Sequence, residues 1–324
     1  MRCHLPYAGN TTATNSIWDA AAYSSNPTPS PPRELQLQLD HLIKSSLTTF
    51  SSKIYLHHLK SFLSFSTNVL LQPATLPVPP QNVALFIAHL HQRSLSISTI
   101  RSYLSAISFL HKLSELNDLT TKFLVSRALI GVQNLQTKSS MQLLPITRTV
   151  LHKLIDAIPF CQTSPYYRTM YKCLFLLMYH ACLRVGEAVQ TTNTTHTLQA
   201  HQVSKTSAGY IVHFQSYKHS RSNQQRAMLT PQSPTIYCLL AALDSYEAIR
   251  GNADGPLFLQ QSSIPLTRPH LATFLRSCLI FSNLSTRLYN THSFRIGRAT
   301  QMAIDGFNDD TIKSTGRWNS TAYL

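Results

Sequence analysis

The sequence lacks any apolar run long enough to span a lipid bilayer. Its first 25 residues also lack the apolar segment of a secretory signal, so neither membrane insertion nor export is predicted. Six cysteines are present, but no two of them form a CxxC pair. Because several lie in apolar, helix-like surroundings, we interpret them as reduced core thiols in a reducing compartment.

Acidic residues are scarce. The chain has 13 Asp and Glu against 28 Lys and Arg, which gives a formal net charge of +15 and a pI near 9.7. Such an excess predicts a polyanionic partner such as double-stranded DNA, because neutralising phosphates releases condensed counterions. A basic protein whose charge only keeps it soluble remains the alternative.

Ligand sets for a metal are also missing. Fifteen histidines are present, but His57-His58 and His89-Leu90-His91 have no further ligands at the spacing of a zinc site. The sequence therefore predicts no metal site.

What the sequence does contain is enough apolar material for a sizeable core. A chain of 324 residues that is 43% hydrophobic fits about two domains of ordinary size. Residues 1–33 are rich in Asn, Thr, Ser and Pro and are predicted to form a disordered arm. We expect a helical bundle over residues 34–136, a linker over residues 137–143, and a second domain over residues 144–324.

Apolar residues recur at helical spacing in the first of these domains, near residues 55–63, 83–90 and 100–110. Pro79 and Pro80 suit the start of the second of these helices, and Ser98 or Thr99 can cap the third. A fourth helix is predicted from about residue 121 to 135.

The second domain is predicted to be mainly helical with a small antiparallel sheet. Leu151, Leu154, Ile155 and Ile158 restart the helical period, and residues 171–189 are apolar enough for one long buried helix. Alternating apolar residues predict a strand over residues 210–214, with residues 226–229 as its hairpin partner. Two further helices are expected, over residues 234–249 and 268–281.

Residues suited to phosphodiester chemistry follow one another along this second domain. Two arginines, Arg184 and Arg295, can clamp a phosphate by forked, charge-assisted hydrogen bonds. Lys218, in the hairpin connection, can protonate a leaving alkoxide, and His292 can transfer a proton. Trp318 lies near the end of the chain.

Each of these residues also has an ordinary structural interpretation. Arg184 and Glu187, three residues apart, can form a structural ion pair, and Lys218 can be a solvated charge in a turn. A His-x-x-Arg spacing arises readily by chance, and Trp318 can be a core aromatic residue. No single signal is specific.

Taken in order, the segments resemble the tyrosine recombinase (phage integrase) family. They are Ala181-Cys182-Leu183-Arg184-Val185-Gly186-Glu187, the hairpin lysine, Thr291-His292-Ser293-Phe294-Arg295 and Gly316-Arg317-Trp318. Residues 51–132 are similar to the helical core-binding domain of that family, and the resemblance covers nearly everything after Glu34. The ending is most similar to recombinases of eukaryotic mobile elements, the Crypton and DIRS-like groups.

The resemblance implies a mainly α fold with a small antiparallel sheet, in which a core-binding bundle precedes an α+β catalytic domain. It further implies that Arg184 and Arg295 hold the scissile phosphate, while Lys218 protonates the leaving 5′-oxygen and His292 assists proton transfer. Trp318 would donate its indole N–H to a phosphate oxygen. Glu187 would orient the site, and no metal or other cofactor is implied, because a 3′-phosphotyrosine conserves the bond energy.

The sequence departs from the family where the nucleophile is expected. Family members place the nucleophilic tyrosine about eight or nine residues beyond the position of Trp318, which would lie past Leu324, so we expect a truncated catalytic domain. Tyr323 resembles a non-catalytic tyrosine that precedes the nucleophile, and its action as a substitute nucleophile is the alternative. The missing end would also carry a helix that docks onto a neighbouring subunit.

Two hypotheses of function follow. The first is a site-specific recombinase or integrase of a mobile element, acting in DNA recombination and integration, self-associating as a tetrameric synapse on DNA if full length, and nuclear in a eukaryote or otherwise cytoplasmic with the nucleoid. The second is a catalytically dead, domesticated DNA-binding protein. In either case the first domain offers four candidate DNA contacts, for which a solvated polar helix end is the alternative: Ser96, Thr99, Arg101 and Ser102.

Overall fold

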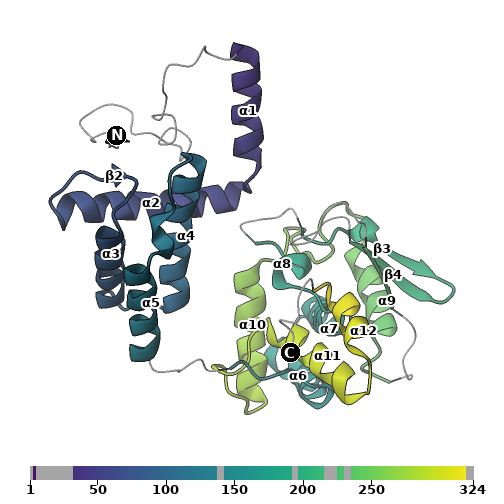
Figure 1. The fold of residues 1–324 in the computed structure, drawn as a ribbon. Helices are drawn as coiled ribbons and strands as arrows, with labels where there is room; N and C mark the ends of the chain where they lie inside the picture. Colours follow the sequence, from purple (N-terminus) through teal and green to yellow (C-terminus); the bar gives the residue numbers. More distant parts are fainter. Residues whose placement is uncertain are drawn as a thin grey trace. The chain divides into compact units, whose positions relative to one another are not determined.

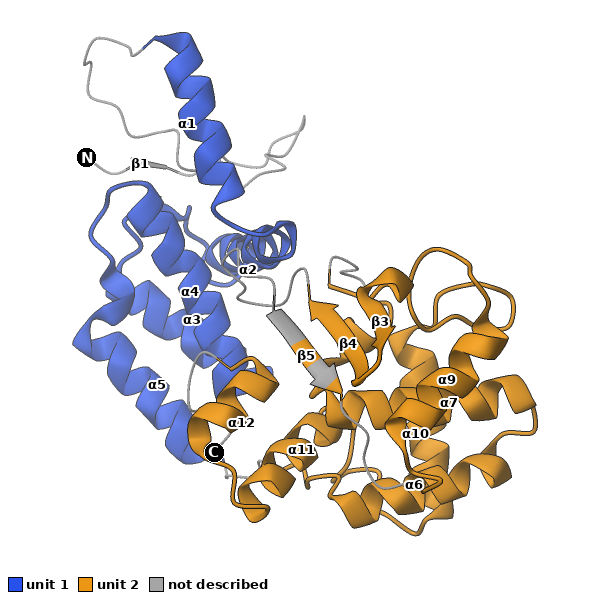
Figure 2. Cartoon of the chain, turned by 90° about the vertical axis from the view of Figure 1, so that its right-hand side faces the viewer, with its two compact units in different colours: residues 1–139 blue, residues 140–324 orange. Residues whose placement is uncertain are grey.

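A computed structural model of the chain describes the short strand β1 (Cys3–His4) and residues 32–136, 142–191, 196–214, 225–229 and 235–318. Two compact units divide the chain, residues 1–139 and residues 140–324 (Figure 2). Apart from Cys3–His4, Pro32 and Arg33, the predicted arm lies outside the described residues, as does most of the predicted linker. Each unit has a hydrophobic core of its own.

The first unit is helical (Figure 1). Its elements are α1 (Arg33–Ser45), α2 (Thr49–Asn68), β2 (Thr75–Leu76), α3 (Pro80–Gln92), α4 (Ile97–Leu113), a 3₁₀ turn at Leu119–Thr121 and α5 (Phe123–Leu135). The predicted stripes of helices α2 to α4 are largely buried, with Val83, Phe86 and Ile100 at 0% exposure. Cys3–His4 pairs with Thr75–Leu76 as a two-residue antiparallel ladder.

Two details of this unit differ from the prediction. Helix α1 was not predicted, although Leu35, Leu39 and Leu42 recur at helical spacing, and none of its residues is buried. Helix α4 begins at Ile97 and its cap is Ser96, two or three residues before the predicted caps, since the Ser96 hydroxyl accepts a hydrogen bond from the backbone N–H of Thr99 at 3.2 Å. The start of helix α3 at Pro80 is confirmed.

The second unit combines helices with one three-stranded sheet, so the prediction of a mainly α fold with a small antiparallel sheet is confirmed. Its helices are α6 (Arg148–Cys161), α7 (Pro165–His180), α8 (Val185–Ala188), α9 (Leu239–Arg250), α10 (Arg268–Phe281), α11 (Ser293–Ile304) and α12 (Asp309–Gly316), with a 3₁₀ turn at Ala200–Gln202. The strands β3 (Val203–Thr206), β4 (Gly209–Phe214) and β5 (Gln225–Leu229) follow one another in antiparallel order. Tyr210 lies opposite Leu229 and Phe214 opposite Gln225, as the hairpin prediction requires.

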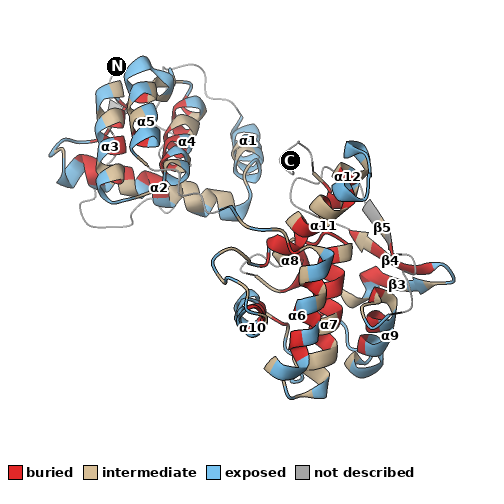
Figure 3. Cartoon of the chain, turned by 90° about the horizontal axis from the view of Figure 1, so that it is seen from below, coloured by how far each residue is buried: buried red, intermediate tan, exposed pale blue. Residues whose placement is uncertain are grey.

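Helix α7 forms the centre of this unit (Figure 3). Nine of its residues are buried in an unbroken core, because helices α6, α9 and α11 all pack against it. Residues 173–179 are all apolar and buried, as the centre of a core requires. Its C-terminal end, and the turn that follows, position the candidate site.

Candidate functional site

The prediction of one long helix over residues 171–189 is wrong. Helix α7 stops at His180 and the chain reverses at Cys182, whose φ of 49° is left-handed. The N–H of Cys182 donates to the carbonyl of Tyr179, and the N–H of Leu183 donates to the carbonyl of Met178 at 3.0 Å. This is the Schellman pattern of helix termination. The sequence hid it, because a cysteine occupies the position that glycine or asparagine usually takes.

The short helix α8 starts directly after this reversal, with Arg184 as its N-cap residue. The carboxylate of Glu187 accepts a hydrogen bond from the backbone N–H of Arg184 at 2.9 Å and one from the Arg184 guanidinium at 2.9 Å. The Arg184 side chain is 24% exposed and the Glu187 side chain only 2%. Glu187 thus holds Arg184 at both its backbone N–H and its guanidinium, while about a quarter of the side chain stays exposed.

Arg295 lies one turn into helix α11 and is 1% exposed. Its guanidinium donates one hydrogen bond to the carbonyl of Cys182 and another to the carbonyl of Gly316. The Trp318 ring covers this guanidinium, with 4.1 Å between the guanidinium carbon and the ring centroid. Arg295 therefore joins the reversal after helix α7 to the end of helix α12.

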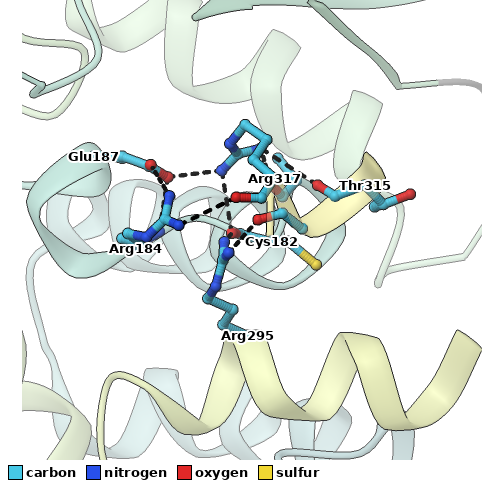
Figure 4. Close-up of polar contacts among 8 residues, drawn as sticks. Cys182, Arg184, Glu187, Arg295, Thr315 and Arg317 are labelled. Carbon is cyan, nitrogen blue, oxygen red and sulfur yellow. Dashed lines mark hydrogen bonds and ion pairs between the residues drawn. The ribbon is translucent and has the colours of Figure 1, made fainter. Parts of the chain in front are cut away.

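A third arginine, which the sequence analysis did not assign to the site, lies between these two. Arg317 is 5% exposed and donates to the carbonyls of Ala181 and Cys182 at 3.1 and 3.2 Å. It also forms an ion pair of 2.7 Å with Glu187. Figure 4 shows Arg184 and Arg317 paired with this one carboxylate, and Arg295 at the carbonyl of Cys182. The only sequence signal for Arg317 was its place between Gly316 and Trp318.

The electrostatics follow from this crowding. Burial by itself would raise the pKa of Glu187, but Arg317 and the N–H and guanidinium of Arg184 lower it below its usual value. Burial and the charges of Arg184 and Arg317 lower the pKa of Arg295 to about 9, which leaves it protonated at neutral pH. Three positive charges against one negative charge leave an excess of two.

His292 lies at the N-terminus of helix α11. Its backbone N–H donates to the side-chain oxygen of Asn290 at 2.7 Å, and the residue is exposed. Partial desolvation of the ring, together with the charges of Arg295 and Arg184, lowers the pKa of His292. A neutral imidazole next to two guanidinium groups can accept a proton at neutral pH.

The structure thus brings together five of the predicted site residues, namely Arg184, Glu187, His292, Arg295 and Trp318. Lys218 and Tyr323 lie outside the described residues. Their assigned roles stay predictions.

The candidate DNA contacts of the first unit lie at the start of helix α4. Ser96, Thr99 and Arg101 are exposed, and Ser102 is half-buried. Ser96 caps the helix, and Arg101 donates to the side chain of Gln133 at 2.9 Å. These contacts fit a structural role as well as a DNA-binding one.

In the described parts of the chain, no group of three or more His, Cys, Asp or Glu side chains is placed to hold a metal ion. Within those same parts, none of the helices has the length and apolarity needed to cross a membrane.

Three solved structures resemble this chain at low sequence identity. The Tn1549 transposon integrase in complex with a circular intermediate DNA matches with a TM-score of 0.60 at 14% identity, over 95% of this chain and 93% of that one. The XerH site-specific recombinase bound to a palindromic difH substrate, in a post-cleavage complex, matches with a TM-score of 0.59 at 15% identity, over 88% and 78%. A lambda integrase dimer bound to a COC' core site gives 0.54 and 12%, over 89% and 74%.

No protein-family model and no curated protein matches the sequence. At identities of 12–15% a structural match establishes the fold and nothing finer. The predicted resemblance is confirmed at that level: the chain has the fold of the tyrosine recombinases, which the Tn1549 integrase, XerH and lambda integrase share.

Proposed function

We propose that this chain is a DNA-binding recombinase or integrase, which cleaves and rejoins DNA strands through a 3′-phosphotyrosine intermediate. One arrangement carries the proposal: Arg184 and Arg317 pair with the single carboxylate of Glu187. Arg295 and Arg317 both donate to the carbonyl of Cys182, and the charges of Arg184 and Arg295 act on His292. The resulting excess of positive charge is half-buried, where an anion is attracted more strongly than it would be in water.

A phosphodiester suits this site better than a small carboxylate does. Arg184, with its side chain 24% exposed, can reach a ligand while its base stays fixed on Glu187. Guanidinium forks match the tetrahedral oxygens of a phosphate. The formal net charge of +15 extends the same preference to the whole chain, which favours a polymer of phosphates as the ligand.

The structures that share the fold support DNA as that polymer. Two of them are described as bound to DNA, namely the Tn1549 integrase with its circular intermediate and lambda integrase with a core site. XerH is described as a site-specific recombinase in a post-cleavage complex. We carry DNA binding and strand cleavage over to this chain as a proposal.

In the proposed reaction, a tyrosine hydroxyl oxygen attacks the phosphorus and the bond from phosphorus to the 5′-oxygen breaks. His292 takes up the tyrosine proton, and Lys218 gives a proton to the leaving 5′-oxygen. Arg184 and Arg295 stabilise the charge of the pentacoordinate transition state, and Trp318 donates its indole N–H. Tyr323, which resembles the non-catalytic tyrosine that precedes the nucleophile of the family, is the alternative nucleophile, and rejoining runs the same steps in reverse.

The first unit would add contacts along the duplex. Arg101 and Lys112 line an open groove of about 550 Å³ on helix α4, and Arg101 belongs to the four candidate contacts. Lys112 also lies 3.6 Å from Asp118, with 70% of its side chain exposed. Phosphate contacts of this kind position the DNA, and groove contacts add sequence preference.

A second candidate function is DNA binding without chemistry. It is favoured by Arg295, which is 1% exposed and donates both terminal nitrogens to main-chain carbonyls. A guanidinium so engaged can hold the site together without contacting a phosphate. The alternative therefore keeps the positive pocket and gives up strand cleavage.

The test is covalent capture on duplex DNA that carries a nick next to a randomised cleavage position, analysed on a denaturing gel. We expect a covalent protein–DNA adduct from the wild-type chain and about a hundredfold less from Arg184→Gln, because a preorganised phosphate ligand is lost. The matched control is Arg276→Met, which removes an exposed arginine of helix α10 and should leave the adduct in place.

Each outcome separates the two candidates. An adduct that Tyr323→Phe removes would identify Tyr323 as the nucleophile, and an undiminished adduct would assign another tyrosine. No adduct under saturating DNA binding would leave the binding protein as the function. We also propose self-association as a tetramer on DNA if full length, and a nuclear location if the host is eukaryotic or a cytoplasmic one with the nucleoid otherwise.

A further inference from the structure

The turn at Gly316–Trp318 contacts all the arginines of the site. The carbonyl of Gly316 accepts from Arg295, and the carbonyl of Arg317 accepts from the guanidinium of Arg184 at 3.3 Å. The ring of Trp318 covers Arg295. One three-residue segment therefore sets the orientation of both arginines that the proposed function assigns to the phosphate.

This turn adopts a conformation that its sequence does not favour. Arg317 has a φ of 56°, in the left-handed region, where a residue other than glycine is disfavoured by about 1 kcal/mol. Gly316 has no room for a side chain, because a Cβ atom there would lie 1.5 Å from the Trp318 ring. Such a conformation persists only where surrounding contacts hold it.

The contacts that hold it come from the Arg317 side chain. Its guanidinium donates to the carbonyls of Ala181 and Cys182 and to Glu187, and it lies 3.9 Å from the centroid of the Phe214 ring. These partners come from the reversal after helix α7, from helix α8 and from strand β4. Arg317 thus ties the turn to three other elements.

The Arg317 side chain also determines whether the charge of Arg184 is available to a ligand. Glu187 gives one carboxylate oxygen to Arg184 and the other to Arg317. The side chains of Arg317 and Glu187 are 1% and 2% exposed, so neither can contact a ligand, whereas Arg184 can. As long as Arg317 neutralises Glu187, the charge of Arg184 remains available to an anion.

We propose that Arg317 is a positioning residue for the phosphate site: it neutralises Glu187 and fixes the 316–318 turn, so that Arg184 faces the ligand with its charge uncompensated and Arg295 is held behind it. It does not contact the ligand itself. The inference rests on the proposed function for the identity of the ligand and extends it to a residue with no assigned role.

The test is a mutant cycle read by the salt dependence of binding to a 30-base-pair duplex DNA. We expect Arg184→Gln to weaken binding about tenfold and to reduce the slope of log K against log[salt] by about one phosphate contact. Arg317→Met should weaken binding and reduce the slope by the same amounts although Arg317 is buried. The Glu187 carboxylate then has Arg184 as its ion-pair partner and neutralises its charge. The double variant should lose no more than either single one.

Two further variants separate positioning from a merely structural role. Glu187→Gln in the Arg317→Met background should restore most of the slope, because the carboxylate that captured Arg184 is gone. Arg317→Lys should keep the slope, since an ammonium still neutralises Glu187. If Arg317→Met does not fold, Arg317→Gln, which keeps a hydrogen-bond donor without the charge, replaces it. Arg276→Met is the matched control, and its effect should add to that of Arg184→Gln.

The outcomes that overturn the proposal are distinct from those that overturn the function. A folded Arg317→Met protein with an unchanged salt slope, or losses that add in the double variant, would refute the positioning role. If the wild-type chain binds no DNA, the proposed function fails. In that case the same variants are compared by the increase in Tm that inorganic phosphate gives. The increase should be smaller in each arginine variant than in the wild-type protein, and no smaller in the double variant than in either single one.

Discussion

A glycine determines how closely helix α11 approaches the segment before helix α6. A Cβ atom at Gly297 would lie 1.9 Å from the carbonyl oxygen of Ile146, which is a main-chain atom with little freedom to move. The N–H of Ile146 also donates to the carbonyl of Ser293 at 3.0 Å. Because Arg295 and His292 lie on the same helix, this contact fixes the position of half of the site.

Gly297→Ala should therefore lower the free energy of unfolding by about 3 kcal/mol, because overpacking against the backbone outweighs the gain in helix propensity. The control is Gly131→Ala in helix α5, where a Cβ atom meets nothing within 4 Å. There we expect a gain of about 0.5 to 1 kcal/mol. Urea denaturation measures both, and a stabilising Gly297→Ala would contradict the close approach.

His180, at the end of helix α7, belongs to a different cluster of cations. Burial, with Arg298, Arg148 and His152 nearby, lowers the pKa of His180 to about 3, against an ordinary value of 6.5. Between these two values the unfolded chain binds the proton more tightly than the folded chain does. The free energy of unfolding therefore rises with pH across this interval. The stability that the neutral His180 contributes is fully present above about pH 6.5 and is lost as the pH falls toward about 3.

We expect the protein to be less stable at pH 5 than at pH 7, by less than about 1.4 kcal/mol per pH unit for this one group. His180→Asn should flatten the dependence, whereas His41→Asn, on exposed helix α1, should leave it in place. Urea unfolding from pH 4 to pH 8 measures it. An equally steep dependence in His180→Asn would show that other groups cause it.

At the scale of elements, helix α1 differs from the other helices of its unit because none of its residues is buried. An isolated helix of 13 residues is marginal in water, since helices of this size depend on packing. Helix α3 has the same length but buries four residues, Val83, Phe86, Ile87 and Leu90.

Backbone amides of helix α1 should accordingly exchange with solvent at least about a hundredfold faster than those of helix α3. The two helices form a matched pair in length, so the difference measures the contribution of burial. Hydrogen exchange followed by mass spectrometry resolves the two segments. Equal protection would mean that helix α1 packs against a partner surface in solution.

The elements also mark the limit of prediction from the sequence. Periodicity located helices α2 to α4, α6 and α10 and the β4–β5 hairpin, because each presents a regular apolar stripe to a core. It failed at the reversal between helices α7 and α8, since residues 171–189 are apolar throughout and Cys182 is not a usual helix terminator. Local hydrogen bonds of the Schellman pattern close that reversal, and Arg295 and Arg317 add tertiary hydrogen bonds to the carbonyls of Ala181 and Cys182.

At the scale of the whole molecule, the chain has two principal hydrophobic cores that share no residue. One lies within residues 59–132 and the other within residues 146–294. Ile107 and Leu174 are both completely enclosed, at 1% and 0% exposure. A cavity in one core should therefore act on its own unit first.

We expect Ile107→Ala and Leu174→Ala each to cost about 2 to 5 kcal/mol, confined to the unit that carries the change. Hydrogen exchange of the two units in each variant measures this, with Ile107→Val, at about 1 kcal/mol, as the milder control. Increased exchange spread evenly over both units would contradict separate cores.

The sequence alone predicted the positive charge of this protein, its helical stripes and its hairpin. It also contains arginines, a histidine and a tryptophan whose order resembles that of a recombinase site. The charge, the stripes and the hairpin are local features that composition, periodicity and spacing suffice to find, whereas the site residues were assigned by resemblance to the tyrosine recombinase family. The tertiary structure decided that Arg317 pairs with Glu187, 130 residues earlier in the chain, and that the turn around Arg317 contacts Arg184 and Arg295. No local pattern could reveal these contacts of Arg317, because the Glu187 carboxylate and the carbonyls of the turn after helix α7 come from distant segments. They approach Arg317 only when the chain has folded.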